Sequence, residues 1–120
     1  MRQEFCNSRS LIAAAGLAGV FSALIGFASI EAFSQPRNVV SQKGREFTPN
    51  AISVARGEAV FIVNDDLNLR HHAYIDSSKF KYDSGDQEPG SEISVTIPVA
   101  GTFDLLCAIH PKMRLVINVK

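Results

Sequence analysis

Hydrophobic and polar residues alternate in short runs along the C-terminal two thirds of the chain, which is the period of a β-strand with one buried face. Turn-forming residues such as Arg56-Gly57 separate the runs, and the Gly-, Pro- and acid-rich stretch 83–90 predicts a loop. The expected strands are 52–54, 59–64, 93–97, 101–106 and 115–119, with earlier strands at Val39-Val40 and Phe47. About seven short strands predict an all-β domain built as a small antiparallel β-sandwich.

The N-terminal residues have a different pattern. Residues 11–30 carry no charge, follow Arg2 and Arg9, and precede Ala32-Phe33-Ser34. A basic start, an apolar run and small residues near a cleavage position are features of an export signal. A run of about 20 apolar residues can also span a bilayer, so an uncleaved membrane tether through 11–30 is the alternative. We expect a signal peptide or anchor helix in 1–34 and one periplasmic domain in 35–120.

Charge and cysteine content narrow the class of protein. Lys and Arg number 12, as do Asp and Glu, and no basic cluster occurs, so we do not expect a nucleic-acid partner. Without residues 1–34 the chain has Cys107 as its one cysteine, so a disulfide within the domain is not expected. A lone thiol in an oxidising compartment needs protection, and ligation to a metal would provide it.

The segment 107–113, CAIHPKM, spaces Cys107, His110 and Met113 as C-x2-H-x2-M. A thiolate, an imidazole and a thioether are soft or borderline ligands, which copper prefers over oxygen donors. A blue-copper site combines two His and one Cys with a long axial Met, so it needs a second histidine. The other two histidines of the chain are His71 and His72, behind the expected strand 59–64.

The segment 100–113, AGTFDLLCAIHPKM, resembles the C-terminal copper loop of the cupredoxins, and its short loop with Pro after His is most similar to the amicyanin type. The segments GEAVFIVN (57–64) and HHAY (71–74) resemble the strand and the motif of the first histidine ligand in that family. The likeness covers about residues 38–120. It implies a Greek-key β-sandwich of the cupredoxin type that holds one type 1 copper ion, cycling between Cu(I) and Cu(II).

The ligand set that this resemblance implies consists of His71, Cys107 and His110 in one plane and Met113 on the axis. Strand alternation places His71 on the apolar face with Ala73 and Ile75, which favours it over His72, although both remain candidates. His72 would then occupy the position of an Asn that braces the copper loop in relatives. Ile109 replaces a Pro of the amicyanin type, and we hypothesise that its N–H donates to the thiolate and raises the reduction potential above that of Ile109→Pro.

The resemblance implies a one-electron carrier, not an enzyme, that acts as a monomer between redox proteins such as a c-type cytochrome or a periplasmic dehydrogenase. His110 would be the electron port, and Lys112 would steer an acidic partner. Residues 64–92 hold seven acids and three bases, which form either a second docking face or a solvated loop surface. The main alternative is a copper-trafficking or storage protein; a Cys–His nucleophilic enzyme and a zinc site fit the residues less well.

Overall fold

The computed structural model describes residues 34–120, which form one compact unit. Residues 1–33 of the predicted signal peptide or anchor (1–34) lie outside the described residues. Within 34–120, no helix is long and apolar enough to cross a membrane. The described part consists of strands and loops, as the alternating pattern predicts.

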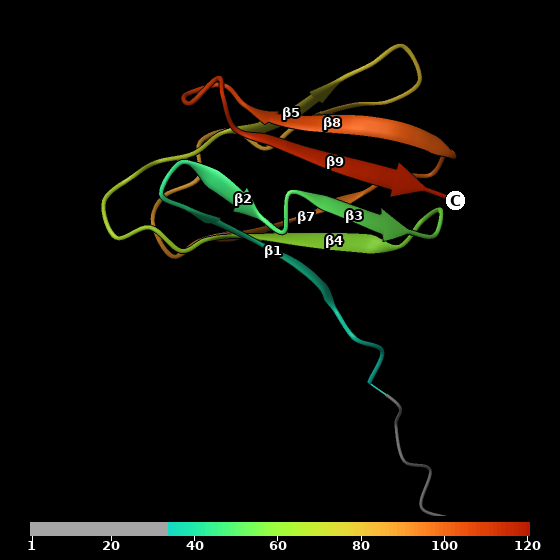
Figure 1. The fold of residues 1–120 in the computed structure, drawn as a ribbon, viewed down its shortest axis with the longest axis horizontal. Coiled ribbons are helices and arrows are strands. Elements are labelled where there is room, and N and C mark those ends of the chain that lie inside the picture. The colour runs from blue at the N-terminus through green and yellow to red at the C-terminus, as the bar shows by residue number, and fades with distance from the viewer. Residues whose placement is uncertain (1–33) are drawn as a thin grey trace, which may run out of the picture. The chain divides into compact units, whose positions relative to one another are not determined.

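Two sheets face each other in the described part (Figure 1). The strands are β1 (Asn38–Lys43), β2 (Glu46–Thr48), β3 (Ala51–Val54), β4 (Ala59–Asn64), β5 (Ala73–Asp76), β6 (Lys81–Asp83), β7 (Glu92–Thr96), β8 (Gly101–Cys107) and β9 (Arg114–Val119). One sheet has the order β2-β1-β4-β7 and the other has the order β3-β9-β8-β5-β6. The prediction of an all-β sandwich is confirmed.

The core lies between the two sheets and is formed by alternate residues of each strand. In β8, for example, Phe103, Leu105 and Cys107 are buried, whereas Thr102 and Asp104 are exposed. Burying an aliphatic or aromatic side chain of this size stabilises the fold by about 1.5–3 kcal/mol. The same alternation that builds the core therefore decides that the thiol of Cys107 points inward.

The expectation of a purely antiparallel sandwich is wrong, because each sheet contains one parallel pair. β1 runs parallel to β4, and β3 runs parallel to β9. The chain leaves the first sheet after β2, adds β3 to the second sheet and returns to the first with β4. This crossing allows neighbouring strands to run in the same direction. Alternation identifies the buried face of a strand but carries no information on the direction of its neighbour.

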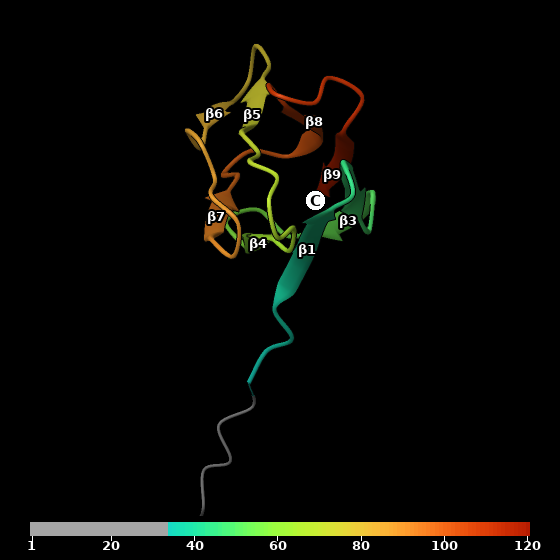
Figure 2. The ribbon, with the colours of Figure 1, turned by 90° about the vertical axis from the view of Figure 1, so that its left-hand side faces the viewer.

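Several segments meet at one end of the sandwich, at the left in Figure 1 and facing the viewer in Figure 2. These are the loop between β4 and β5, the loop between β8 and β9, and the turn of the β1–β2 hairpin. Gly44 and Arg45 form that turn with φ values of 62° and 63°, as in a two-residue type I′ hairpin. Cys107 ends β8 and Met113 immediately precedes β9, as predicted.

Candidate metal centre

Three side chains predicted from the sequence come together at this end of the sandwich. Cys107 Sγ lies 3.8 Å from His71 Nδ1 and 3.7 Å from His110 Nδ1, and the two nitrogen atoms are 3.2 Å apart. Bonds from a transition metal to His and Cys are about 2.0–2.3 Å long, so one ion fits among atoms at these separations. Two imidazoles and a thiol form a donor set that suits copper. His72 does not belong to this cluster.

His71 is held at its backbone and at its ring. It lies just before β5 and is fully buried. Its N–H donates to the carbonyl of Gln87 (3.1 Å), and its own carbonyl accepts from the N–H of Gln87 (2.7 Å). At the ring, Nε2 lies 2.7 Å from Asp66 Oδ2. These contacts leave Nδ1 free to face Cys107 and His110.

Asp66 lies in the loop that follows β4, and its two oxygens have separate partners. Oδ1 accepts from the N–H of Gly44 at 3.0 Å, and Oδ2 faces His71. Burial raises the pKa of Asp66, but the hydrogen bonds from Gly44 and His71 and the charges of His71 and Lys43 outweigh it, so the pKa is lowered overall. The carboxylate therefore stays ionised beside the candidate centre.

A buried amide network holds the loop that carries Asp66. Asn64 Nδ2 donates to the carbonyls of Leu69 (2.9 Å) and Gln87 (3.0 Å), and Asn64 Oδ1 accepts from the N–H of Asp66 (3.1 Å). Gln42 Nε2 donates to Gln87 Oε1 at 2.8 Å. Asn64 uses both its amide nitrogen and its oxygen, and these bonds hold the loop, because breaking them would leave buried polar groups without partners. Gln42 Oε1 and Gln87 Nε2 are buried without a partner among the described residues.

The sequence reasoning missed this network, although a signal was available. Asn64 continues the buried series of Val60 and Ile62 in β4, and Gln42 follows Val40 in β1 in the same phase. A polar residue in the buried phase of a strand indicates a specific hydrogen-bond partner. The partner, Gln87, lies in the predicted loop 83–90 and forms an isolated bridge with His71.

Cys107 is buried at the end of β8, opposite Ala73 of β5. The backbone N–H of His72 donates to Cys107 Sγ at 3.5 Å. Among the described residues, no other backbone N–H donates to this sulfur. The structure therefore gives no support to the hypothesis that the Ile109 N–H donates to the Cys107 thiol. The two N–H groups differ because β5 pairs directly with β8, whereas Ile109 lies beyond the end of β8.

His110 and Met113 belong to the loop between β8 and β9. The N–H of Met113 donates to the carbonyl of His110 at 3.0 Å, and the N–H of Ala108 donates to the carbonyl of His72 at 2.9 Å. Met113 is buried, whereas His110 is half-buried. Burial is the main cause that lowers the pKa of His110, and electrostatic interactions with His71 and Arg45 add to it, although Asp66 opposes the shift.

The His72 side chain points away from the cluster. Its Nδ1 lies 3.0 Å from Asp86 Oδ1 and its Nε2 lies 2.7 Å from Asp83 Oδ1. The hydrogen bond to Asp86, supported by that to Asp83, raises the pKa of His72 despite its partial burial. The His72 side chain therefore does not brace the loop between β8 and β9 as the Asn of relatives does. The backbone of His72 contacts Cys107 and Ala108 instead.

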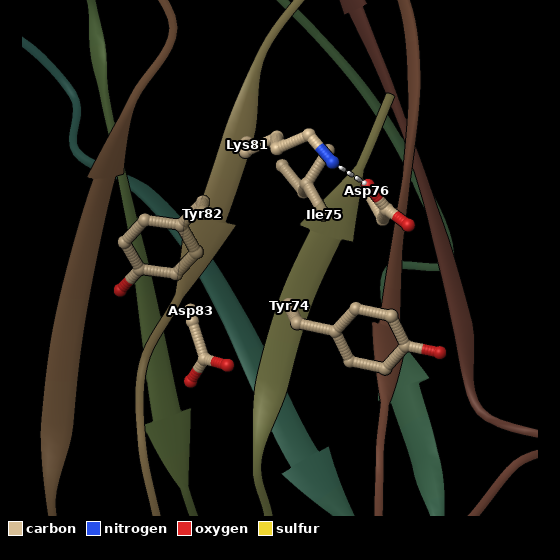
Figure 3. Close-up of a pocket in the computed structure, with 6 residues that line it drawn as sticks. All are labelled: Tyr74, Ile75, Asp76, Lys81, Tyr82 and Asp83. Atoms are coloured by element: carbon tan, nitrogen blue, oxygen red, sulfur yellow. Dashed lines mark hydrogen bonds and ion pairs between the residues drawn. The ribbon is translucent and has the colours of Figure 1, made fainter. Parts of the chain in front are cut away.

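Most acids of segment 64–92 have cationic partners. The ion pairs are Asp76–Lys81 (2.6 Å), Asp86–Arg70 (3.3 Å), Glu88–Arg70 (2.9 Å) and Glu92–Arg37 (2.6 Å). Figure 3 shows the first pair beside a hollow over β5 and β6, where Tyr74 and Tyr82 point to opposite sides. Because local cations compensate these acids, the solvated-loop interpretation is favoured over a second docking face.

Comparison with solved structures identifies the fold. The copper-containing nitrite reductase of Thermus scotoductus SA-01 matches with a TM-score of 0.64 and 24% identity over 71% of this chain. Oxidised amicyanin carrying a proline-to-alanine mutation matches with a TM-score of 0.64, 22% identity and 70% of this chain covered. The chain has the cupredoxin fold. Reduced amicyanin with a proline-to-glycine mutation gives a TM-score of 0.65 and 21% identity over 74% of this chain.

The extent of the cupredoxin match differs between these structures. The match covers 82% and 87% of the two amicyanin chains but 22% of the nitrite reductase chain. The likeness to the reductase thus concerns one part of a much longer protein. No family model matches the sequence, and a comparison of the sequence with curated proteins found no match.

Proposed function

We propose that this protein is a type 1 copper protein that carries single electrons between redox partners. The observation that carries the proposal is the convergence of His71 Nδ1, His110 Nδ1 and Cys107 Sγ within 4.8 Å of one another. The match to amicyanin, solved in oxidised and Cu(I) forms, supports the same function. Bound copper would supply the one-electron change between Cu(I) and Cu(II).

The proposed ligands are His71, Cys107 and His110, and Met113 would supply its thioether as a further ligand. The burial of His71, Cys107 and Met113 would keep water away from a bound ion, and the amide network limits movement of His71. Because rigidly held ligands move little when the charge of the ion changes, the reorganisation energy is small and electron transfer is fast. The buried thiol also argues against the trafficking alternative, because metal exchange requires access to the ligands.

Electrons would enter and leave at His110, the most accessible ligand. A hollow of about 450 Å³ beside it is lined by the hairpin turn and by the copper loop. Arg45 and Lys112, which form no ion pair within residues 34–120, line this hollow together with Glu46 and the apolar side chains of Ile109 and Pro111. The two cations outnumber the one acid, so the lining is positively charged. We infer that the partner presents an acidic surface here. A c-type cytochrome or a periplasmic dehydrogenase would be suitable, with the protein acting as a periplasmic monomer.

The nitrite reductase match does not lead us to propose an enzyme. The match covers 22% of the reductase chain. In the proposed centre, the three clustered side chains of His71, Cys107 and His110 all serve as metal ligands. Electron transfer at a covered site needs no substrate cleft beside the ion. We therefore propose a carrier whose reaction partners are other proteins.

A visible absorption spectrum of the Cu(II)-loaded protein, with Cys107→Ala as the control, tests this function. An intense thiolate-to-copper charge-transfer band that the control lacks is the expected result. Repeated reduction and reoxidation should return the same spectrum without loss of copper. A pale complex, or release of copper on reduction, would contradict the electron-carrier proposal and favour trafficking or storage.

A further inference from the structure

Asp66 is the side chain next to the candidate centre that the sequence did not single out. It is about nine-tenths buried, with a side-chain exposure of 10%. Its Oδ2 lies 2.7 Å from His71 Nε2, on the opposite side of the imidazole from the nitrogen that faces Cys107. It is the one acid within hydrogen-bond distance of the cluster among the described residues.

The contacts of Asp66 require two acceptor atoms. Oδ1 accepts a hydrogen bond from the N–H of Gly44, and Oδ2 is placed to accept a hydrogen bond from the Nε2–H group of His71. A carboxylate has two acceptor oxygens, whereas an amide has one oxygen and a donor group. Asparagine at this position could satisfy one of the two partners and would present N–H groups to the other.

The protein fixes Asp66 from the backbone as well. Asn64 accepts the Asp66 N–H at 3.1 Å and also donates to Leu69, so the loop is tied on both sides of Asp66. Gly44 belongs to the β1–β2 hairpin, which brings a second element against the carboxylate. The carboxylate is therefore held in place by two segments before any metal binds.

We propose that Asp66 is a positioning residue that holds His71 in its Nε2–H tautomer, directs Nδ1 to the metal and lowers the reduction potential of the centre. This proposal rests on the proposed function for its redox part. A carboxylate that accepts from a metal-bound histidine orients the ring and makes it a stronger ligand. Its negative charge stabilises Cu(II) more than Cu(I), because the attraction grows with the charge of the ion.

The first test uses the metal-free protein and does not depend on copper. Nitrogen NMR of the histidine rings should show His71 in the Nε2–H tautomer in the wild-type protein. Asp66→Ala should lose this preference, while Asp65→Asn should keep it. Asp65 is the matched control because it is adjacent and acidic but contacts Ser41 instead of a histidine. An Nδ1–H tautomer in the wild-type protein would overturn the proposal, whether or not the variants fold.

The second test measures Cu(II) and Cu(I) affinity and the reduction potential of Asp66→Asn and Asp65→Asn. We expect Asp66→Asn to lower the Cu(II) affinity by about 10- to 100-fold, and the Cu(I) affinity by less. Each tenfold difference between the two losses corresponds to a potential about 59 mV higher. Equal shifts in both variants would contradict a positioning role, because then only the net charge would matter.

The two tests separate the inference from the proposed function. If the tautomer result holds but the copper complex of the wild-type protein is pale, the electron-carrier function fails while Asp66 retains its effect on His71. If the complex is intensely coloured but the tautomer does not depend on Asp66, the inference fails and the function stands.

Discussion

The two histidines of the candidate centre have different surroundings. His71 is fully buried and is held by Gln87 at its backbone and by Asp66 at its ring. His110 is half-buried in a loop, and its ring contacts Cys107 and His71 through Nδ1. We infer that the two histidines have different roles. The buried side of the centre, with His71 and Asp66, fixes the geometry of the ligands, and the loop side, with His110, provides contact with a partner.

The largest expected effect on stability comes from removing the buried imidazole of His71. His71→Ala should destabilise the metal-free fold by about 2–4 kcal/mol, because it leaves a cavity and a buried carboxylate with one partner fewer. Urea unfolding of the metal-free protein measures this loss. His110→Ala, in the exposed loop, is the matched comparison and should cost less than about 1 kcal/mol. Equal losses would remove the distinction between the two sides.

A second variant tests whether the buried hydrogen bonds of Asn64 hold the loop that carries Asp66 in place. Asn64→Ala removes the donor to Leu69 and Gln87 and the acceptor for Asp66, so we expect a loss of about 2–3 kcal/mol in unfolding free energy. Amide hydrogen exchange of residues 65–72 should also increase. Asn68→Ala, an exposed asparagine in the same loop, serves as the control and should change neither measurement.

An external imidazole should be able to replace the ring of His110 but not that of His71. His110→Gly opens the centre toward the hollow lined by Ile109 and Lys112, so added imidazole should enter and restore the visible band of the Cu(II) protein. His71→Gly should not be restored in this way, because its ring is covered on all sides. Titration with imidazole, followed by absorption, measures the difference. Restoration of both variants would show that both histidines are accessible.

Charge at the hollow should affect electron-transfer rates more weakly. Arg45→Gln and Lys112→Gln should each slow oxidation by hexacyanoferrate(III) about two- to tenfold at low salt, because they reduce attraction to an anion. Stopped-flow kinetics measure the rate, and the effect should shrink as salt is added. Lys79→Gln, an exposed cation on the β5–β6 connection, is the control and should have little effect. An equal decrease in the control would indicate that only net charge matters.

The smallest effect concerns Ile109. Because the backbone hydrogen bond to Cys107 Sγ comes from His72, Ile109→Pro should change the ratio of Cu(II) to Cu(I) affinity by less than tenfold. That corresponds to a potential shift below about 59 mV. Voltammetry of both proteins decides the matter, and a larger drop in the variant would reinstate Ile109 as a donor to the sulfur.

Local patterns in the sequence predicted much of the fold and of the cluster. Alternation identified seven of the nine described strands but not β5 or β6. The spacing of Cys107, His110 and Met113 located the loop that carries them. The parallel pairs were not predictable in this way, because the crossing between β2 and β3 depends on packing between sheets. The contacts of Asp66 and Gln87 were missed because the fold decides which groups meet. Gln42 and Asn64, in the buried phase of their strands, indicated that polar partners exist but not which residues they are.

A bound metal would also act as a cross-link. It would tie positions 71 and 107, which are 36 residues apart, in a described domain whose one cysteine is free. Closing a loop of this length reduces the conformational freedom of the unfolded chain, as a disulfide does. Unlike a disulfide, this tie depends on the supply of the ion. We expect the empty protein to be cleaved by proteases faster than the loaded one, so that its lifetime would follow metal availability.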